Sequence, residues 1–170
     1  MLESLRRRSG RKARADQLCR AITERARAPM FYGDLGVADT IDGRFDLVAM
    51  HAWLVLDALL NRGETELAQS LIDRLFLQFD EALRELGVGD MGMGRRMRGM
   101  AEAFYGRLEA YRTAADEKAL AAAILRNLYR GEPGGVESAS RLATYCAGAR
   151  AHLAQSHPER GEVDFGALPA

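Results

Sequence analysis

Apolar residues recur every three or four positions along nearly the whole sequence, and no stretch alternates convincingly with a period of two. This spacing is typical of amphipathic helices and argues against strands. We therefore predict an all-α fold, a single-domain bundle of about six helices. The predicted helices cover residues 11–28, 42–62, 65–86, 91 or 93–113, 116–130 and 136 to about 155.

Proline, glycine and aspartate mark the ends of these predicted helices. Pro29 stops the first helix, because proline has no amide hydrogen to donate. Asp42 is expected to cap the second helix, and Gly63 to end it. Gly87 is expected to end the third helix, with Asp90 as the cap of the fourth. Short corners should therefore separate the helices.

Two of the helices carry informative apolar patterns. The second is apolar on nearly all sides, which places it in the middle of the bundle. One apolar stripe consists of Leu47, Met50, Leu54 and Ala58, and the other consists of Phe45, Val48, Val55 and Leu59. The third has one apolar face, formed by Leu67, Leu71, Leu75, Phe79, Leu83 and Leu86.

The charge is uneven along the chain although the net charge is zero. Residues 1–28 hold nine arginine or lysine residues against three acidic ones. Such a basic end can meet the phosphates of lipid headgroups or RNA, but a solvated helix face without a dedicated partner is the favoured interpretation. We divide the chain into a basic flexible N-terminus (1–10), a helical domain (11–155) and a loose C-terminal tail (156–170).

The stretch GVGDMGMGRRMRGMAEAFYGR, residues 87–107, begins with the pattern G-x-G-x-x-G. In dinucleotide-binding proteins those glycines join a strand to a helix whose N-terminus holds the pyrophosphate. Here the preceding residues, ALREL, end a long predicted helix, so the expected strand is missing. The glycines are therefore interpreted as a helix corner.

The helix after this corner has a methionine stripe, made of Met93, Met97, Met100, Phe104 and Tyr111. Methionine adapts to irregular surfaces and can line a permissive binding groove. Filling of the core is the favoured interpretation.

A stripe of small residues lies about 100° around the same helix and consists of Gly92, Gly99, Ala103, Gly106 and Ala110. Interior glycine costs about 1 kcal/mol of helix stability relative to alanine, so the stripe indicates a close backbone contact. A neighbouring helix of the same protein is the favoured occupant, and a helix from another protein is the alternative.

Charged residues flank these stripes. Arg95 and Arg98 point away from the methionines and should face solvent. The remaining charges are predicted to form an acid/base cluster. In this cluster Arg44 pairs with an aspartate near the start of its own helix, and the acidic residues are also partners for Arg96 and Arg107, which lie between the two stripes. A structural role for this cluster is favoured over a client contact; its members are Asp39, Asp42, Arg44, Asp46, Arg96 and Arg107.

The sequence contains no convincing catalytic or metal-binding motif. His51 has no second histidine four residues away and is interpreted as a packed side chain. Cys19 and Cys146 fit structural thiols in a reducing compartment. Walker, nucleophile-elbow, haem-attachment and di-iron spacings are missing. We predict no enzyme activity, no cofactor and no metal, and a binding or assembly role follows by elimination.

The targeting signals are equally sparse. No apolar region long enough for a secretory signal follows the N-terminal charges. The longest apolar stretch, residues 47–60, is shorter than the ~20 residues that a bilayer needs. We expect a cytoplasmic protein that is soluble or peripheral at the inner membrane, on the matrix side if the source is mitochondrial.

Three stretches together resemble the ubiquinol–cytochrome c chaperone family: FYGDLGVADTIDGRFDLVAMHAWLVL (31–56), LRELGVGDMGMGRRMRGM (83–100) and AFYGRLEAY (103–111). The resemblance implies an all-helical, non-enzymatic assembly factor that binds newly made cytochrome b of respiratory complex III. Mitochondrial relatives work with a small second chaperone near the ribosomal exit. This chain is similar to bacterial relatives, and it has Ala38 where proline is common and Arg95, Arg96 and Arg98 where lysine is common.

The resemblance implies a client protein, and the predicted helix that carries the methionine and small-residue stripes supplies the candidates for binding it. They are Met93, Arg95, Met97, Arg98, Gly99, Met100 and Gly106. Two other functions remain open: a basic adaptor for the ribosome, RNA or an anionic membrane, and a small-molecule enzyme. No DNA partner is predicted.

Overall fold

The computed structural model describes residues 2–169, with side chains for 6–89 and 91–169, so Met1 of the predicted basic N-terminus and Ala170 of the predicted tail lie outside it. Within that range the chain forms seven α-helices and two short 3₁₀ turns, and no strand. The all-α prediction is confirmed. The elements are α1 (Leu2–Ala26), α2 (Pro29–Gly33), α3 (Ile41–Leu60), α4 (Thr65–Glu85), α5 (Asp90–Arg112), α6 (Glu117–Leu128), η1 (Pro133–Gly135), α7 (Val136–Gln155) and η2 (Pro158–Arg160).

Helix α3 is the centre of the bundle, as its all-round apolar pattern predicted. It packs against α1, α4, α5, α6 and α7. Every residue in 46–56 is buried, including two polar ones, Asp46 and His51. The other helices cover α3 and leave only its first turn and its last residues at the surface.

The start of α3 differs from the prediction in its capping residue. The helix is capped by Thr40, whose hydroxyl accepts a hydrogen bond from the Gly43 amide at 3.1 Å. Asp42 lies inside the first turn, where its charge suits the positive end of the helix dipole. A Cβ on Gly43 would lie 2.0 Å from the carbonyl oxygen of Ala38, so only glycine fits there.

Glycines end α3 and α4, as predicted. Gly63 and Gly87 both have positive φ, at 75° and 80°, in the left-handed region that favours glycine. The residue capping α5 is Gly89 rather than Asp90, which is the first residue of the helix. Leu86 was assigned to the buried face of α4, but it follows the helix and is 57% exposed.

The two ends of the chain differ from the sequence-based expectation in secondary structure and in packing. Helix α1 begins at Leu2, well before the predicted start at Arg11. The segment after α7, predicted to be loose, packs onto the core through Pro158, Phe165 and Pro169, all buried. Arg25 of α1 donates hydrogen bonds to two carbonyl oxygens of this segment, those of Gly166 and Ala167. These contacts and the burial of its apolar side chains hold the segment in place.

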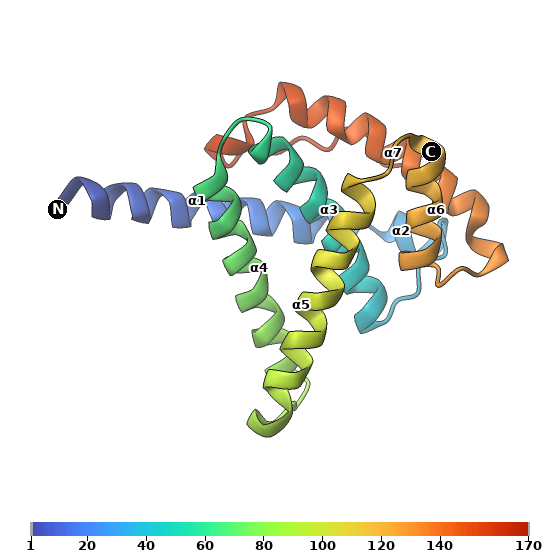
Figure 1. Cartoon of the computed structure of the whole chain (residues 1–170), viewed down its shortest axis with the longest axis horizontal. Helices are drawn as coiled ribbons and strands as arrows, with labels where there is room; N and C mark the ends of the chain where they lie inside the picture. The colour runs from blue at the N-terminus through green and yellow to red at the C-terminus, as the bar shows by residue number, and fades with distance from the viewer. Residues whose placement is uncertain (1, 170) are drawn as a thin grey trace.

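Helices α4 and α5 form a hairpin that extends away from the rest of the bundle (Figure 1). Their far ends meet at the glycine corner, which carries the exposed side chains of Leu86 and Met91. None of the helices within residues 2–169 is long and apolar enough to cross a membrane.

Candidate functional site

The methionine stripe of α5 faces the core, as the favoured interpretation predicted. Met93 is 6% exposed, and Met97 and Met100 are half-buried against the core cluster. Phe104 and Tyr111 on the same stripe are fully buried. Most of this stripe is therefore packing, and only Met100 also reaches the groove described below.

The glycines of the small-residue stripe of α5 do not pack against another helix within the described residues, contrary to the favoured interpretation, whereas Ala110 packs against the core. A Cβ built on Gly99 or Gly106 would meet no atom within 4 Å, and a Cβ on Gly92 would meet only the Val88 side chain at 3.8 Å. All three glycines are exposed. These glycines would let another backbone approach α5 closely, but no segment of the described chain does so.

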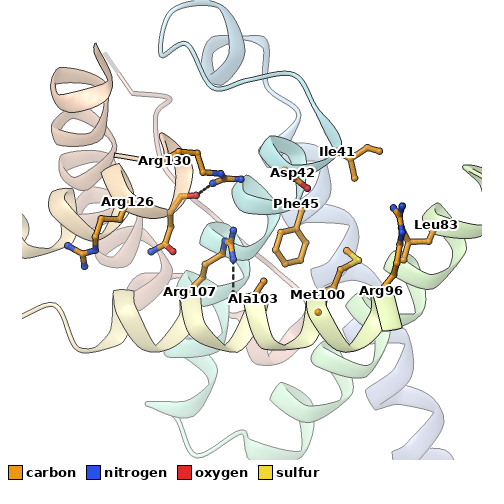
Figure 2. A pocket seen from close by; sticks show the side chains of 12 residues that line it. Ile41, Asp42, Phe45, Leu83, Arg96, Met100, Ala103, Arg107, Arg126 and Arg130 are labelled. Atoms are coloured by element: carbon orange, nitrogen blue, oxygen red, sulfur yellow. Dashed lines mark hydrogen bonds between the residues drawn. The ribbon is translucent and has the colours of Figure 1, made fainter. Parts of the chain in front are cut away.

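A groove of about 390 Å³ lies beside this stripe, between α5, the first turn of α3 and the end of α6 (Figure 2). Its floor is apolar and its rim carries four arginines. The lining residues are Ile41, Asp42 and Phe45 from α3, Leu83 from α4, Arg96, Gly99, Met100, Ala103 and Arg107 from α5, and Arg126, Asn127 and Arg130 from the end of α6. We call this the arginine groove.

A second, more apolar hollow of about 300 Å³ continues the arginine groove toward α1. The two share Ile41, Phe45, Leu83 and Met100 as lining residues. Ile41 is 53% exposed and Leu86, which lines the second hollow, is 57% exposed. The surface therefore offers a continuous apolar strip bordered by positive charge.

Asp46 lies beneath the arginine groove and holds its walls together. Its side chain is completely buried, with Oδ1 2.6 Å from Arg107 Nε and Oδ2 2.8 Å from Arg130 Nη2. Neither contact meets the angles of a hydrogen bond, so both are ion pairs. Burial raises the pKa of the Asp46 carboxyl, and the charges of Arg107 and Arg130 oppose that rise. This centre ties α3 to α5 and α6.

The two arginines that pair with Asp46 are fixed by further contacts. Arg107 donates to the carbonyl oxygen of Ala103 at 3.0 Å, and its guanidinium lies over the Phe45 ring, 5.2 Å from the centroid. Arg130 donates to the carbonyl oxygen of Asn127 and has a positive φ of 55°, which costs a non-glycine residue about 1 kcal/mol.

The rest of the predicted acid/base cluster does not meet at this centre. Arg44 pairs with Asp39 at 2.6 Å on the exposed surface, as expected. A hydrogen bond from Arg44 lowers the pKa of the Asp39 carboxyl. Arg96 lines the groove, but it makes no ion pair with any described residue, although a carboxylate partner was predicted.

The structure thus brings together members of both predicted sets and leaves others apart. Gly99 and Met100 of the client-binding candidates meet Asp42, Arg96 and Arg107 of the acid/base cluster. The candidates Arg95, Arg98 and Gly106 are exposed on α5 but line neither hollow.

Sequence reasoning missed several groove residues. Phe45 and Leu83 were predicted only as apolar helix positions, and Ile41, Arg126 and Arg130 were not singled out. Arg126 lies in the last turn of α6 and Arg130 lies just after this helix, and no local pattern indicates that this end of α6 faces α5.

His51 is a packed side chain, as predicted, within a buried hydrogen-bond network. Its Nδ1 lies 2.8 Å from the Leu47 carbonyl oxygen and its Nε2 lies 2.9 Å from the Tyr145 hydroxyl. Tyr145 in turn accepts a hydrogen bond from Arg25 Nε at 2.9 Å. Burial lowers the pKa of His51 to about 4, so the ring is neutral at pH 7.

The thiols and possible metal ligands add no further site. Cys19 and Cys146 are both free and buried, in agreement with structural thiols. Burial raises the pKa of Cys146 to about 12. In the part of the chain that the structure describes, no cluster of three or more histidine, cysteine or acidic side chains is arranged to hold a metal ion.

Comparisons with known proteins agree with the resemblance seen in the sequence. Residues 33–160 match the family described as ubiquinol-cytochrome C chaperone. The chain is also similar to a solved structure, the Cbp3 homolog from Brucella abortus, with 32% sequence identity and a TM-score of 0.84 over 98% of this chain and 97% of that one. None of the curated proteins matches the chain at a significant level.

Proposed function

The chain belongs to the ubiquinol–cytochrome c chaperone family, and from that premise we propose that its client is newly made cytochrome b. Family membership supports the general role, a chaperone in the assembly of respiratory complex III. It also implies binding rather than catalysis. In the proposed role the chain holds cytochrome b until its haems and partner subunits arrive, and a small second chaperone can assist.

The observation that carries this proposal is the apolar strip formed by the arginine groove and its continuation. A chaperone for a membrane protein needs an accessible apolar surface, and exposed apolar patches of this kind are typical of interaction sites. Gly99 and Ala103 at the wall of the groove let another backbone approach closely. We therefore propose this groove, rather than the whole of α5, as the client-binding surface.

A capture experiment in cells that make complex III tests the client. The tagged chain should co-purify with cytochrome b labelled during a short pulse, and cells lacking the chain should accumulate less cytochrome b. Gly99→Leu should weaken the capture, because the larger side chain fills the groove. Gly94→Leu is the matched control, since Gly94 lies on the same helix, has equally open space and lines neither hollow.

The outcomes separate clearly. Normal cytochrome b levels in cells lacking the chain would exclude cytochrome b as an essential client. Equal capture by the Gly99→Leu and Gly94→Leu variants would place the client on another surface, with Arg95, Arg98 and Gly106 as the next candidates.

A second candidate function is favoured by the front of α1, which extends beyond the other helices (Figure 1). Arg6, Arg7, Arg8 and Lys12 are exposed there. We propose that this end contacts an anionic membrane surface or the ribosome, which would keep the protein peripheral at the inner membrane.

Sedimentation with anionic vesicles and with ribosomes, at low and high salt, tests this contact. Binding through exposed charges should fall steeply as salt rises, because charges are screened beyond ~8 Å at physiological ionic strength. Replacing the three arginines at 6–8 by glutamine should abolish it. Association that is unaffected by both changes would contradict the proposal.

A further inference from the structure

The arginine groove has more positive charge than its own acids balance. Asp46 pairs with Arg107 and Arg130 beneath the groove, and among the described residues Asp42 is the one acid that lines it. Arg96 and Arg126 make no ion pair with any of the described residues. Two guanidinium groups are therefore available to an external anion.

These two arginines stand at opposite ends of the groove (Figure 2). Arg96 lies beside Leu83, whereas Arg126 lies beyond Arg107 at the other end. Arg96 and Arg107 are eleven residues apart on α5, which at 1.5 Å per residue corresponds to about 16 Å, or three helical turns. Arg126 lies farther along the groove than Arg107 in Figure 2, so the two available arginines bracket an apolar stretch of three helical turns or more.

The middle of the groove suits an apolar segment rather than a second charge. Phe45 and Met100 form its floor in Figure 2, with Ala103 on the α5 side. Gly99 adds an open position where a Cβ would meet nothing. A polypeptide can therefore lie close to α5 between the two charged ends.

We propose that the groove recognises an apolar client segment, three or more helical turns long, that carries a carboxylate at each end. The carboxylates pair with Arg96 and Arg126, and the apolar side chains contact Phe45 and Met100. Guanidinium groups attract carboxylates strongly, and this site already uses that attraction in the ion pairs between Asp46 and its two arginines. The inference rests on the proposed client-binding function and names the chemistry of the segment.

Synthetic peptides test this inference on the purified full chain. The probe is a fluorescein-labelled helical peptide of about 20 residues with a leucine and alanine face and glutamates fourteen residues, or about four helical turns, apart. Two comparison peptides carry glutamine or lysine at the same two positions. Fluorescence anisotropy should give about three- to tenfold tighter binding of the glutamate peptide than of the glutamine peptide, and the weakest binding of the lysine peptide.

Substitutions in the chain should remove this preference without removing the groove. With Arg96→Gln and Arg126→Gln together, the glutamate and glutamine peptides should bind equally well. Both side chains are exposed and have no ion pair to lose, so the variant should melt like the unmodified chain. Arg20→Gln with Lys118→Gln removes the same charge from exposed positions outside the groove and should leave the preference intact.

Three results would overturn the inference. They are equal binding of the glutamate and glutamine peptides to the unmodified chain, an acid preference that survives in the Arg96→Gln, Arg126→Gln variant, and displacement of the peptide by vesicles of anionic but not neutral phospholipid. Failure of the client proposal looks different, because cytochrome b would then escape capture whatever the peptides do. Capture of cytochrome b without an acid preference would leave that proposal standing and reject this inference alone.

Discussion

Asp46 and His51 lie on the same helix, α3, and both are completely buried, yet the protein accommodates them in different ways. His51 is neutral, and each ring nitrogen has a hydrogen-bond partner deep in the core. Asp46 is instead surrounded by cations, one of which, Arg130, remains 48% exposed. The neutral His51 lies within the core, whereas the ion pairs of Asp46 lie at its border.

This difference explains why only one of the two centres adjoins a candidate site. The His51 network is enclosed by aromatic rings, with Phe31 and Phe165 in edge-on contact at 5.2 and 5.3 Å. The Asp46 ion pairs fix Arg107 and Arg130 at the wall of an open groove. The first centre therefore stabilises the fold alone, and the second also shapes a surface.

The largest effect is expected from breaking the charged centre. Asp46→Ala leaves Arg107, which is 15% exposed, without its partner. We expect a loss of about 3–5 kcal/mol in the free energy of unfolding, measured by urea titration followed by circular dichroism. Asp57→Ala removes the partially exposed pair with Arg150 from the same helix and should cost less than about 1 kcal/mol. Similar losses in the two variants would show that burial of Asp46 has no special role.

The neutral centre should appear as a pH dependence. The folded pKa of His51 is about 4, below the ordinary value of 6.5, so the unfolded chain binds a proton first as the pH falls. Stability contributed by the neutral ring is complete above about pH 6.5 and is lost between pH 6.5 and 4, by about 3 kcal/mol.

His51→Asn provides the control for this pH dependence, because asparagine does not titrate. The difference in unfolding free energy between the unmodified chain and this variant should shrink across that pH window. A difference that is constant from pH 7 to pH 4 would contradict the assigned neutral state of His51.

The smallest effect on stability is expected in the groove itself. Gly99→Leu adds a side chain in open space and replaces glycine within a helix, so the free energy of unfolding should stay unchanged or rise by up to about 1 kcal/mol. Gly43→Ala is the contrasting change, since its Cβ would clash with the Ala38 carbonyl oxygen and cost about 1–3 kcal/mol. Strong destabilisation by Gly99→Leu would mean that the groove is closed in solution.

The sequence predicted the arrangement of residues on each helix well, but it did not predict which faces meet. The all-round apolar pattern of α3 correctly placed it in the centre, and the methionine stripe of α5 correctly marked a core-facing side. The same periodicity assigned Gly99 and Gly106 to a contact with a neighbouring helix, and no such helix is present in the described chain. Periodicity reports which residues share a face, whereas the element that covers the face depends on tertiary packing.

The groove and the C-terminal segment escaped prediction for related reasons. Arg126 in the last turn of α6 and Arg130 just after it reach the groove, and their position depends on how α6 packs against the body. The segment after α7 contains Pro158 and Pro169, which indicated a loose tail. In the structure these two prolines and Phe165 are buried, and Arg25 donates hydrogen bonds to the segment.

The contact between Arg25 and the carbonyl oxygens of Gly166 and Ala167 has a consequence for the order of folding. Helix α1 is synthesised first, but part of its surface is completed only by residues made at least 141 positions later. Such non-local contacts form slowly, and during synthesis they must wait until the ribosome has made residue 167. The α3–α4–α5 region, whose contacts are closer in sequence, can pack earlier, so the surface around Tyr145 should be the last part of the protein to become protected.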